Sequence, residues 1–187
     1  MITTIIFDFF DVFMTDSYKA WLSANGFERT GAFEEASILS DQGKLSQDEF
    51  YEKISHAAGQ PITAEQMNAN ATINNELVRF ARELRKHYNT GLLSNAPAEV
   101  ERALLHKYTL VDIFDHIFIS GETGLIKPHQ EAFENALTSM NVQANETIFI
   151  DDNPTNVESA KQLGIHAIVF TSVAQLRIDL TRMGVEI

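Results

Sequence analysis

The feature of this sequence that most constrains its fold is a series of short apolar runs, each of which stops abruptly at polar residues. Five runs rich in β-branched and aromatic side chains lie at residues 3–7, 89–93, 116–119, 147–150 and 166–170. Continuous apolar runs of this length are typical of strands that are buried on both faces. The runs therefore predict the strands of a parallel sheet.

Helix signals alternate with these runs in the second half of the chain. We expect Pro97, Pro128 and Pro154 each to stand at a helix start, where a missing N–H is tolerated. Glu99 and Glu101 fall in the first turn of the first of these helices, where the helix dipole favours carboxylates. Strand and helix in alternation predict an α/β fold with a doubly wound, Rossmann-like parallel sheet.

The segment from about residue 15 to 84 carries helical signals alone. Capping-box patterns begin at Ser46 and Thr63, and Gly43 and Gly59 are helix stops. Helices are expected at residues 17–25, 31–41 and 46–58 and from residue 63 onward. We therefore expect a Rossmann-like core at residues 1–14 and 85–187, with a small all-helical cap at residues 15–84 inserted after the first strand.

The charge of the chain limits its partners. Lysine and arginine number 14 and acidic residues 26, so the net charge is 14 − 26 = −12, which repels phosphate backbones and anionic lipid. No run approaches the roughly 18 apolar residues of a membrane span. The chain has no cysteine, and its six histidines lack ligand-type pairing, so a zinc site is not expected. We expect a cytoplasmic protein without nucleic-acid or membrane partners, and no oligomeric state is indicated.

Polar residues follow the first four runs and should meet at one edge of the sheet. They are Asp8, Ser94 with Asn95, Lys127, and Asp151 with Asp152. In open α/β sheets, ligands bind outside the carboxyl ends of the strands. Converging carboxylates repel one another unless a cation joins them, and Mg²⁺ prefers carboxylates together with phosphate oxygens. This chemistry suits phosphoryl transfer, with Asp8 as the group that attacks phosphorus.

These residues, in this order, resemble the motifs of the haloacid dehalogenase superfamily. Its four motifs are matched in order by Asp8, by Ser94 and Asn95, by Lys127, and by Asp151 with Asp152. The stretch from Gly124 to Pro128, and Asn156 after the acidic pair, resemble the helical-capped phosphatase branch. Sugar-phosphate phosphatases and the phosphatase-like half of soluble epoxide hydrolase belong to this branch, and the resemblance spans essentially the whole chain.

The resemblance implies a metal site. Asp8 would be both the nucleophile and a Mg²⁺ ligand, Asp152 would be a ligand, and Asp151 would bind directly or through water. The backbone carbonyl of Phe10 would be a further ligand. Asn156 would brace the acidic pair from behind.

The resemblance also implies a phosphoryl site. Ser94 and Asn95 would hold phosphoryl oxygens, and Lys127 would neutralise Asp8 and the phosphoryl charge. The expected reaction is Mg²⁺-dependent hydrolysis of a small phosphorylated metabolite, a phosphate monoester, through an aspartyl-phosphate.

One position departs from the family pattern. Phosphatases of this family usually carry a second Asp two residues after the nucleophile as general acid and base, and here that residue is Phe10. General acid–base assistance contributes roughly 10²- to 10⁴-fold, so we expect a slow phosphatase. Asp11 and Asp16 are the candidates for replacing the missing acid, and the sequence leaves that choice open.

Two other functions remain open from the sequence. The first is a 2-haloacid dehalogenase that uses Asp8 without metal. Dehalogenases also carry an aromatic residue at the position of Phe10, and the departure of a halide needs no proton. The paired carboxylates Asp151 and Asp152 count against it, because they make little sense without a cation. The second is a catalytically degenerate module that binds a phosphorylated ligand or a protein.

Overall fold

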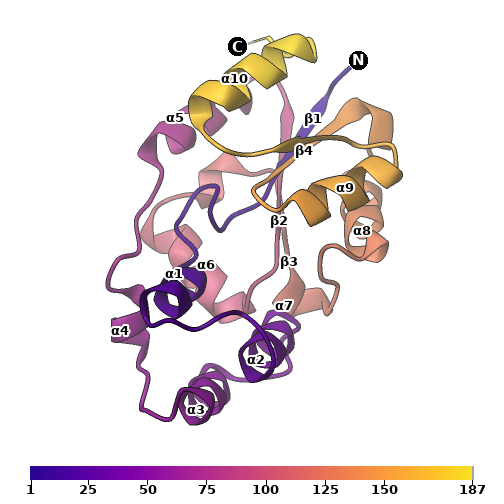
Figure 1. Ribbon diagram of the computed structural model, residues 1–187. Helices are drawn as coiled ribbons and strands as arrows, with labels where there is room; N and C mark the ends of the chain where they lie inside the picture. The colour runs from indigo at the N-terminus through magenta and orange to yellow at the C-terminus, as the bar shows by residue number, and fades with distance from the viewer. Residues whose placement is uncertain (187) are drawn as a thin grey trace.

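The computed structural model describes residues 1–186 and contains one five-stranded sheet (Figure 1). All neighbouring strands are parallel, and their order across the sheet is β3-β2-β1-β4-β5. The strands are β1 (Thr4–Phe7), β2 (Asn89–Ser94), β3 (His116–Ile119), β4 (Thr147–Asp151) and β5 (His166–Val169). The predicted doubly wound α/β fold is confirmed, because β1 lies in the centre and the chain winds outward from it to both sides.

Helices surround the sheet on both faces and at one end. Those before β2 are α1 (Ser17–Ala24), α2 (Ala32–Asp41), α3 (Gln47–Ala58), α4 (Ala64–Asn68) and α5 (Asn75–Leu84). Those after β2 are α6 (Ala98–Lys107), α7 (Ser120–Thr123), α8 (Gln130–Met140), α9 (Pro154–Gln162) and α10 (Val173–Arg182), with short 3-10 turns η1 (Val111–Ile113) and η2 (Ala144–Glu146). Within residues 1–186, none of these helices has the length and apolar character that a membrane span would require.

The two faces of the sheet carry separate hydrophobic cores. On one face, apolar side chains of α5, α6 and α10 pack against β1 and β4, with Phe7, Phe80 and Leu180 among the buried residues. On the other face, α8 and α9 contribute Phe133 and Val157, among others. Figure 1 shows α5 and α10 on one side of the strands and α8 and α9 on the other. Burial on both faces explains why the strand sequences are continuously apolar rather than alternating.

The helices α1 to α4 form a third cluster of their own. Tyr18, Leu22, Phe33 and Ile54 are buried there together, and Figure 1 shows these helices at the end of the sheet away from the chain termini. Helix α5 does not join them. Its buried residues belong to the core on the sheet, and the cap boundary at residue 84 stays a prediction.

One local expectation about helices differs from the structure, and the burial of one helical side chain was not indicated by the sequence. Pro128 does not begin a helix: the N–H of His129 donates to the carbonyl of Ile126 at 3.0 Å, which closes a turn, and α8 starts at Gln130. Glu101 lies in the first turn of α6 as expected, and its side chain is fully buried. The sequence therefore indicated where both helices lie, while tertiary packing decided the first residue of α8 and the burial of Glu101 in α6.

Candidate active site

The pairing of the two central strands brings three carboxylates together. In the β1–β4 register, Phe7 lies opposite Ile150, so Asp8 and Asp151 leave the sheet side by side. One carboxylate oxygen from each of Asp8, Asp151 and Asp152 lies within 4.8 Å of the other two. Hard oxygen ligands at this spacing fit a single Mg²⁺ ion, and the residues present are therefore compatible with the expected metal.

Lys127 lies between two of these carboxylates. Its Nζ donates to Asp8 Oδ1 at 2.6 Å and to Asp151 Oδ2 at 2.8 Å, and the residue is only 4% exposed. Burial lowers the pKa of this ammonium, but the charges and hydrogen bonds of Asp151 and Asp8 outweigh burial and hold the pKa above its ordinary value. Lys127 therefore stays charged, and it supplies the one cation that faces Asp8 from within the described part of the core.

The environment of Asp8 opposes its ionisation. Burial is the largest influence and raises the pKa of Asp8 to about 7, against the lowering effect of Lys127, and the negative charge of Asp151 raises it further. Asp8 and the acidic pair carry more negative charge than Lys127 neutralises. A divalent cation beside Asp8 would relieve this imbalance and favour the ionised carboxylate.

Two asparagine side chains form hydrogen bonds that position Asp151 and Lys127. Asn156 Nδ2 donates to both oxygens of Asp151, at 3.2 and 3.0 Å, as expected for a residue that orients the acidic pair. Asn95 makes two hydrogen bonds with the backbone of Lys127: its Nδ2 donates to the carbonyl at 2.8 Å and its Oδ1 accepts from the N–H at 2.9 Å. The Asn95 side chain thus holds the Lys127 loop, and its contact with a phosphoryl oxygen stays a prediction.

Ser94 ends β2 in the same region and is buried. Its hydroxyl has no hydrogen-bond partner among residues 1–186, and neither has the carboxyl group of Glu101. A buried hydroxyl without a partner is uncommon in folded proteins. Ser94 is not among the residues that line the cavity described below, and its contact with a phosphoryl oxygen stays a prediction.

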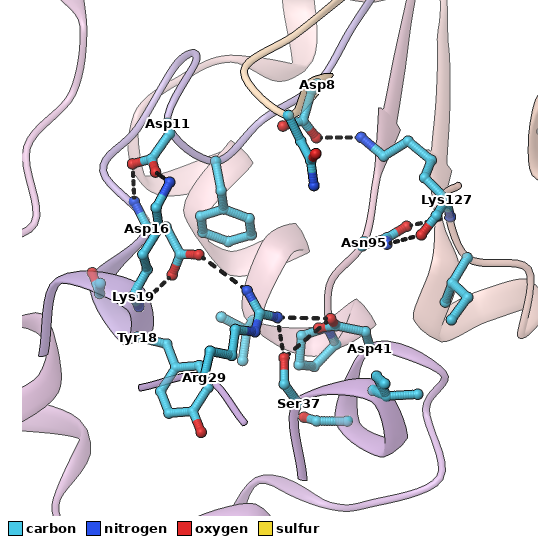
Figure 2. A pocket seen from close by; sticks show the side chains of 18 of the residues that line it. Asp8, Asp11, Asp16, Tyr18, Lys19, Arg29, Ser37, Asp41, Asn95 and Lys127 are labelled. Atoms are coloured by element: carbon cyan, nitrogen blue, oxygen red, sulfur yellow. Dashed lines mark hydrogen bonds and ion pairs between the residues drawn. The ribbon is translucent and has the colours of Figure 1, made fainter. Parts of the chain in front are cut away.

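A cavity of about 830 Å³ separates this cluster from the cap. Asp8, Phe10, Lys127 and Asp152 line its core side, and residues of α1, α2, α3 and α4 line the other side. Figure 2 shows Asp8, Asn95 and Lys127 across the cavity from side chains of the cap. The ring of Phe10 packs against Phe9, with 5.1 Å between ring centroids, so the position of the usual general acid is occupied by an apolar side chain.

The two candidates for the missing acid are both engaged with other residues. Asp11, whose φ is +56°, accepts from the N–H of Asp16 at 2.9 Å and pairs with Lys19 Nζ at 2.6 Å. Asp16 caps α1 by accepting from the N–H of Lys19 at 3.0 Å, and it forms an ion pair with Arg29 at 3.5 Å. In this arrangement both carboxyl groups already accept hydrogen bonds or ion pairs from other residues.

Several cavity residues were not indicated by the sequence. Lys19 reaches from α1 to within 3.3 Å of Asp152 Oδ2, and Arg29, Ser37 and Asp41 form a polar group on the cap (Figure 2). No motif marks these residues. Their positions depend on how the cap lies over the sheet, which local sequence patterns do not encode.

The fold and the site together define an α/β enzyme with carboxylates and a buried lysine at the ends of its central strands. The family model for haloacid dehalogenase-like hydrolases matches residues 2–164, and the chain belongs to this family. The resemblance seen in the sequence motifs is thereby confirmed, and the chain is a hydrolase.

Three similar proteins cover nearly the whole chain. D-ribitol-5-phosphate phosphatase of Bacteroides thetaiotaomicron is 28% identical over 97% of this chain and 98% of its own length. A predicted hydrolase of the family from Porphyromonas gingivalis has a TM-score of 0.76 at 26% identity, with 100% of each chain covered. An enzyme of the family from Bacteroides thetaiotaomicron, solved with magnesium and inorganic phosphate, has a TM-score of 0.73 at 21% identity and covers 94% of this chain and 99% of its own. At 21% identity, the similarity to this last structure supports the fold of the present chain alone.

Proposed function

We propose that this chain hydrolyses small phosphate monoesters, with Mg²⁺ held by Asp8, Asp152, Asp151 and the carbonyl of Phe10. The observation that carries the proposal is the geometry around Asp8. Its carboxylate shares a 4.8 Å cluster with Asp151 and Asp152, and it accepts a 2.6 Å hydrogen bond from the buried Lys127. A carboxylate placed between a cation and a metal site is equipped to act as a nucleophile toward phosphorus.

The chain's own residues would divide the work of the reaction. A carboxylate oxygen of Asp8 forms a bond to phosphorus while the bond from phosphorus to the ester oxygen breaks, and the departing alcohol oxygen takes up a proton from solvent. Water then attacks the phosphorus of the aspartyl-phosphate, which releases inorganic phosphate and restores Asp8. Lys127 and the Ser94 hydroxyl would bind the phosphoryl oxygens. The metal would neutralise the carboxylates and the phosphoryl charge.

The side chain at position 10 makes slow turnover part of the proposal. Phe10 offers no proton to the leaving oxygen, and Asp11 and Asp16 are held by Lys19 and Arg29. Without general acid catalysis the expected loss is about 10²- to 10⁴-fold. Esters with poor leaving groups would be affected most, because their alkoxides need the proton most.

The similar proteins support a small phosphorylated metabolite as the substrate. The relative from Bacteroides thetaiotaomicron that spans the whole chain acts on D-ribitol 5-phosphate, and a shorter match in Pyrococcus furiosus acts on glyceraldehyde 3-phosphate. Both substrates are compact enough for a cavity of about 830 Å³. With a net charge of −12, we propose a cytoplasmic enzyme with no nucleic-acid partner.

A panel of metabolite phosphate monoesters, assayed with Mg²⁺ and with EDTA, tests the proposal. We expect phosphate release that EDTA abolishes and Mg²⁺ restores, and we expect Asp8→Asn to lose at least about 10³-fold in kcat/KM because it removes the nucleophile. The carbonyl of Phe10 contributes through the backbone, so Phe10→Leu is the matched variant that keeps this ligand.

Two outcomes would replace the proposal with an alternative. The aromatic residue Phe10, two positions after Asp8, is the one observation that favours a 2-haloacid dehalogenase, and halide release from 2-haloacids after complete metal removal would establish that activity. Inorganic phosphate binding with no turnover of any monoester would instead indicate a degenerate binding module.

A further inference from the structure

The cap presents a polar group to the cavity that the proposed chemistry does not use. We call Arg29, Ser37, Asp16 and Asp41 the cap cluster. Arg29 Nη1 lies 3.5 Å from Asp16 Oδ2, Arg29 Nη2 lies 3.5 Å from Asp41 Oδ2, and Nη2 also donates to Ser37 Oγ. The guanidinium carbon stands 5.6 Å from the ring centroid of Tyr18. Figure 2 shows the cap cluster facing Asp8 and Lys127 across the cavity.

The charge of the cap cluster disfavours a second anionic group on a substrate. One cation faces two carboxylates, so the fully ionised cluster has a net charge of −1. Burial raises the pKa of Asp41 to about 7, against the lowering effect of Arg29, so at neutral pH the net charge lies between −1 and zero. Glu34 lines the same cavity and adds a further carboxylate. The guanidinium is therefore already neutralised.

The cap cluster nevertheless keeps hydrogen-bonding capacity. Its two ion pairs are 3.5 Å long, beyond the 2.7–3.2 Å of a good hydrogen bond. Among the residues that the structure describes, Arg29 Nε and Asp41 Oδ1 make no hydrogen bond. The guanidinium of Arg29 offers hydrogen-bond donors, and the carboxylates beside it offer acceptors. Adjacent hydroxyl groups on a ligand can each donate and accept a hydrogen bond, so they are complementary to this arrangement.

The cap cluster is held at a fixed place relative to the core. The hydroxyl of Ser120 in α7 donates to the backbone carbonyl of Asp41, which fixes the end of α2 on the core. Gly43 packs so closely there that a Cβ would lie 2.5 Å from the carbonyl oxygen of Gly121. The separation between the cap cluster and Asp8 is therefore set by backbone contacts, which makes the cap cluster able to select the tail of a substrate.

We propose that the cap cluster binds the hydroxyl groups of a neutral, polyhydroxylated substrate tail and discriminates against tails with a second anionic group. This inference rests on the proposed phosphatase activity and narrows its substrate class to monophosphates of sugars or sugar alcohols. Lys127 and the metal site would take the single phosphoryl group, while Arg29 and Asp41 read the hydroxyls at the far end.

Three phosphate monoesters test the inference in the Mg²⁺-loaded enzyme. They are a five-carbon sugar-alcohol phosphate, a phosphorylated hydroxy acid that carries a carboxylate, and p-nitrophenyl phosphate, which has neither hydroxyls nor a second charge. We expect kcat/KM for the sugar-alcohol phosphate to exceed that for the phosphorylated hydroxy acid by at least about 10-fold. A preference for the carboxylate-bearing ester would overturn the inference.

Asp41→Asn is the decisive variant, because it keeps the shape of the side chain and removes the charged acceptor. We expect the ratio of kcat/KM for the sugar-alcohol phosphate to that for p-nitrophenyl phosphate to fall about 10- to 100-fold, the loss typical of one charge-assisted hydrogen bond. The phosphorylated hydroxy acid should gain relative to both. Arg29→Lys, which keeps the charge without the planar donors, should lower the same ratio.

Glu35→Gln provides the matched control. It removes one negative charge from the same helix, but Glu35 pairs with Lys53 at 3.4 Å and does not line the cavity, so the ratio should stay within about twofold. An equal fall for all three esters in Asp41→Asn would overturn the inference alone. Failure to hydrolyse even p-nitrophenyl phosphate with Mg²⁺ would overturn the proposed function and, with it, the inference.

Discussion

Replacing the buried Glu101 should make the stability of this protein less sensitive to pH. Glu101 lies in α6 and is 0% exposed, and its carboxyl group has no hydrogen-bond partner among residues 1–186. Burial raises its pKa to about 8 from an ordinary value of 4.5; the neighbouring Ser94 hydroxyl lowers it, and the charge of Asp8 raises it. The folded protein therefore retains a proton that the unfolded chain releases in this pH range.

The sign and size of the effect follow from this difference. Below pH 4.5 the carboxyl group is protonated in both states, so its stabilising contribution is fully present. As pH rises toward 8, the free energy of unfolding falls by about 1.4 kcal/mol per pH unit from this group. The loss amounts to roughly 3 kcal/mol at pH 7. Gln does not ionise, so Glu101→Gln should gain about this much relative to the wild type between pH 4.5 and 7.

Urea denaturation between pH 4.5 and 8 in metal-free buffer measures this difference. Asp8 and Asp41, whose pKa values are also raised by burial, contribute to both proteins and largely cancel in the comparison. Glu99→Gln is the control, because it changes an exposed carboxyl group in the same turn of α6, and its curve should run parallel to the wild type. A parallel curve for Glu101→Gln would refute the reasoning.

Three further predictions concern activity, packing and metal affinity. Phe10→Asp should raise kcat by about 10²- to 10⁴-fold for alkyl phosphates and less for p-nitrophenyl phosphate; an equal rate would mean that another group already donates the proton. Gly121→Ala should cost about 2 kcal/mol and lower the Tm, because its Cβ would lie 2.6 Å from the backbone N of Ala98 and 2.8 Å from the carbonyl oxygen of Ala96; an unchanged Tm contradicts this. Asn156→Ala should weaken Mg²⁺ binding about 10- to 100-fold by calorimetry, because it frees Asp151; unaltered affinity would remove Asn156 from this role.

The elements that the sequence predicted well are those whose signals are local. Apolar runs identified the strands, and capping residues such as Ser46 and Thr63 located helix starts that the structure contains. The prediction that a helix starts at Pro128 was wrong, because a turn closes at His129 and α8 begins only at Gln130. Such turns depend on neighbouring backbone contacts as well as on the residue type.

The topology of the sheet made it predictable that the side chains of the candidate site lie close together. Residues that follow parallel strands must meet at the same edge of the sheet, so Asp8, Lys127 and Asp151 were expected together, and the structure places them within hydrogen-bond distance. The partner choices within the site were not predictable. The Asn95 amide holds the backbone of Lys127 through two hydrogen bonds of 2.8 and 2.9 Å, and these depend on the tertiary positions of two loops that lie far apart in the sequence.

The sequence by itself determined the parallel sheet, the family and the residues at the strand ends, because periodicity, capping and strand order are written along the chain. Only the tertiary structure decided that α5 packs on the sheet, that Glu101 is buried and that Arg29 and Asp41 face Asp8 across a cavity. An amphipathic helix specifies which of its faces is buried, but the surface that covers that face is set by contacts between residues distant in sequence.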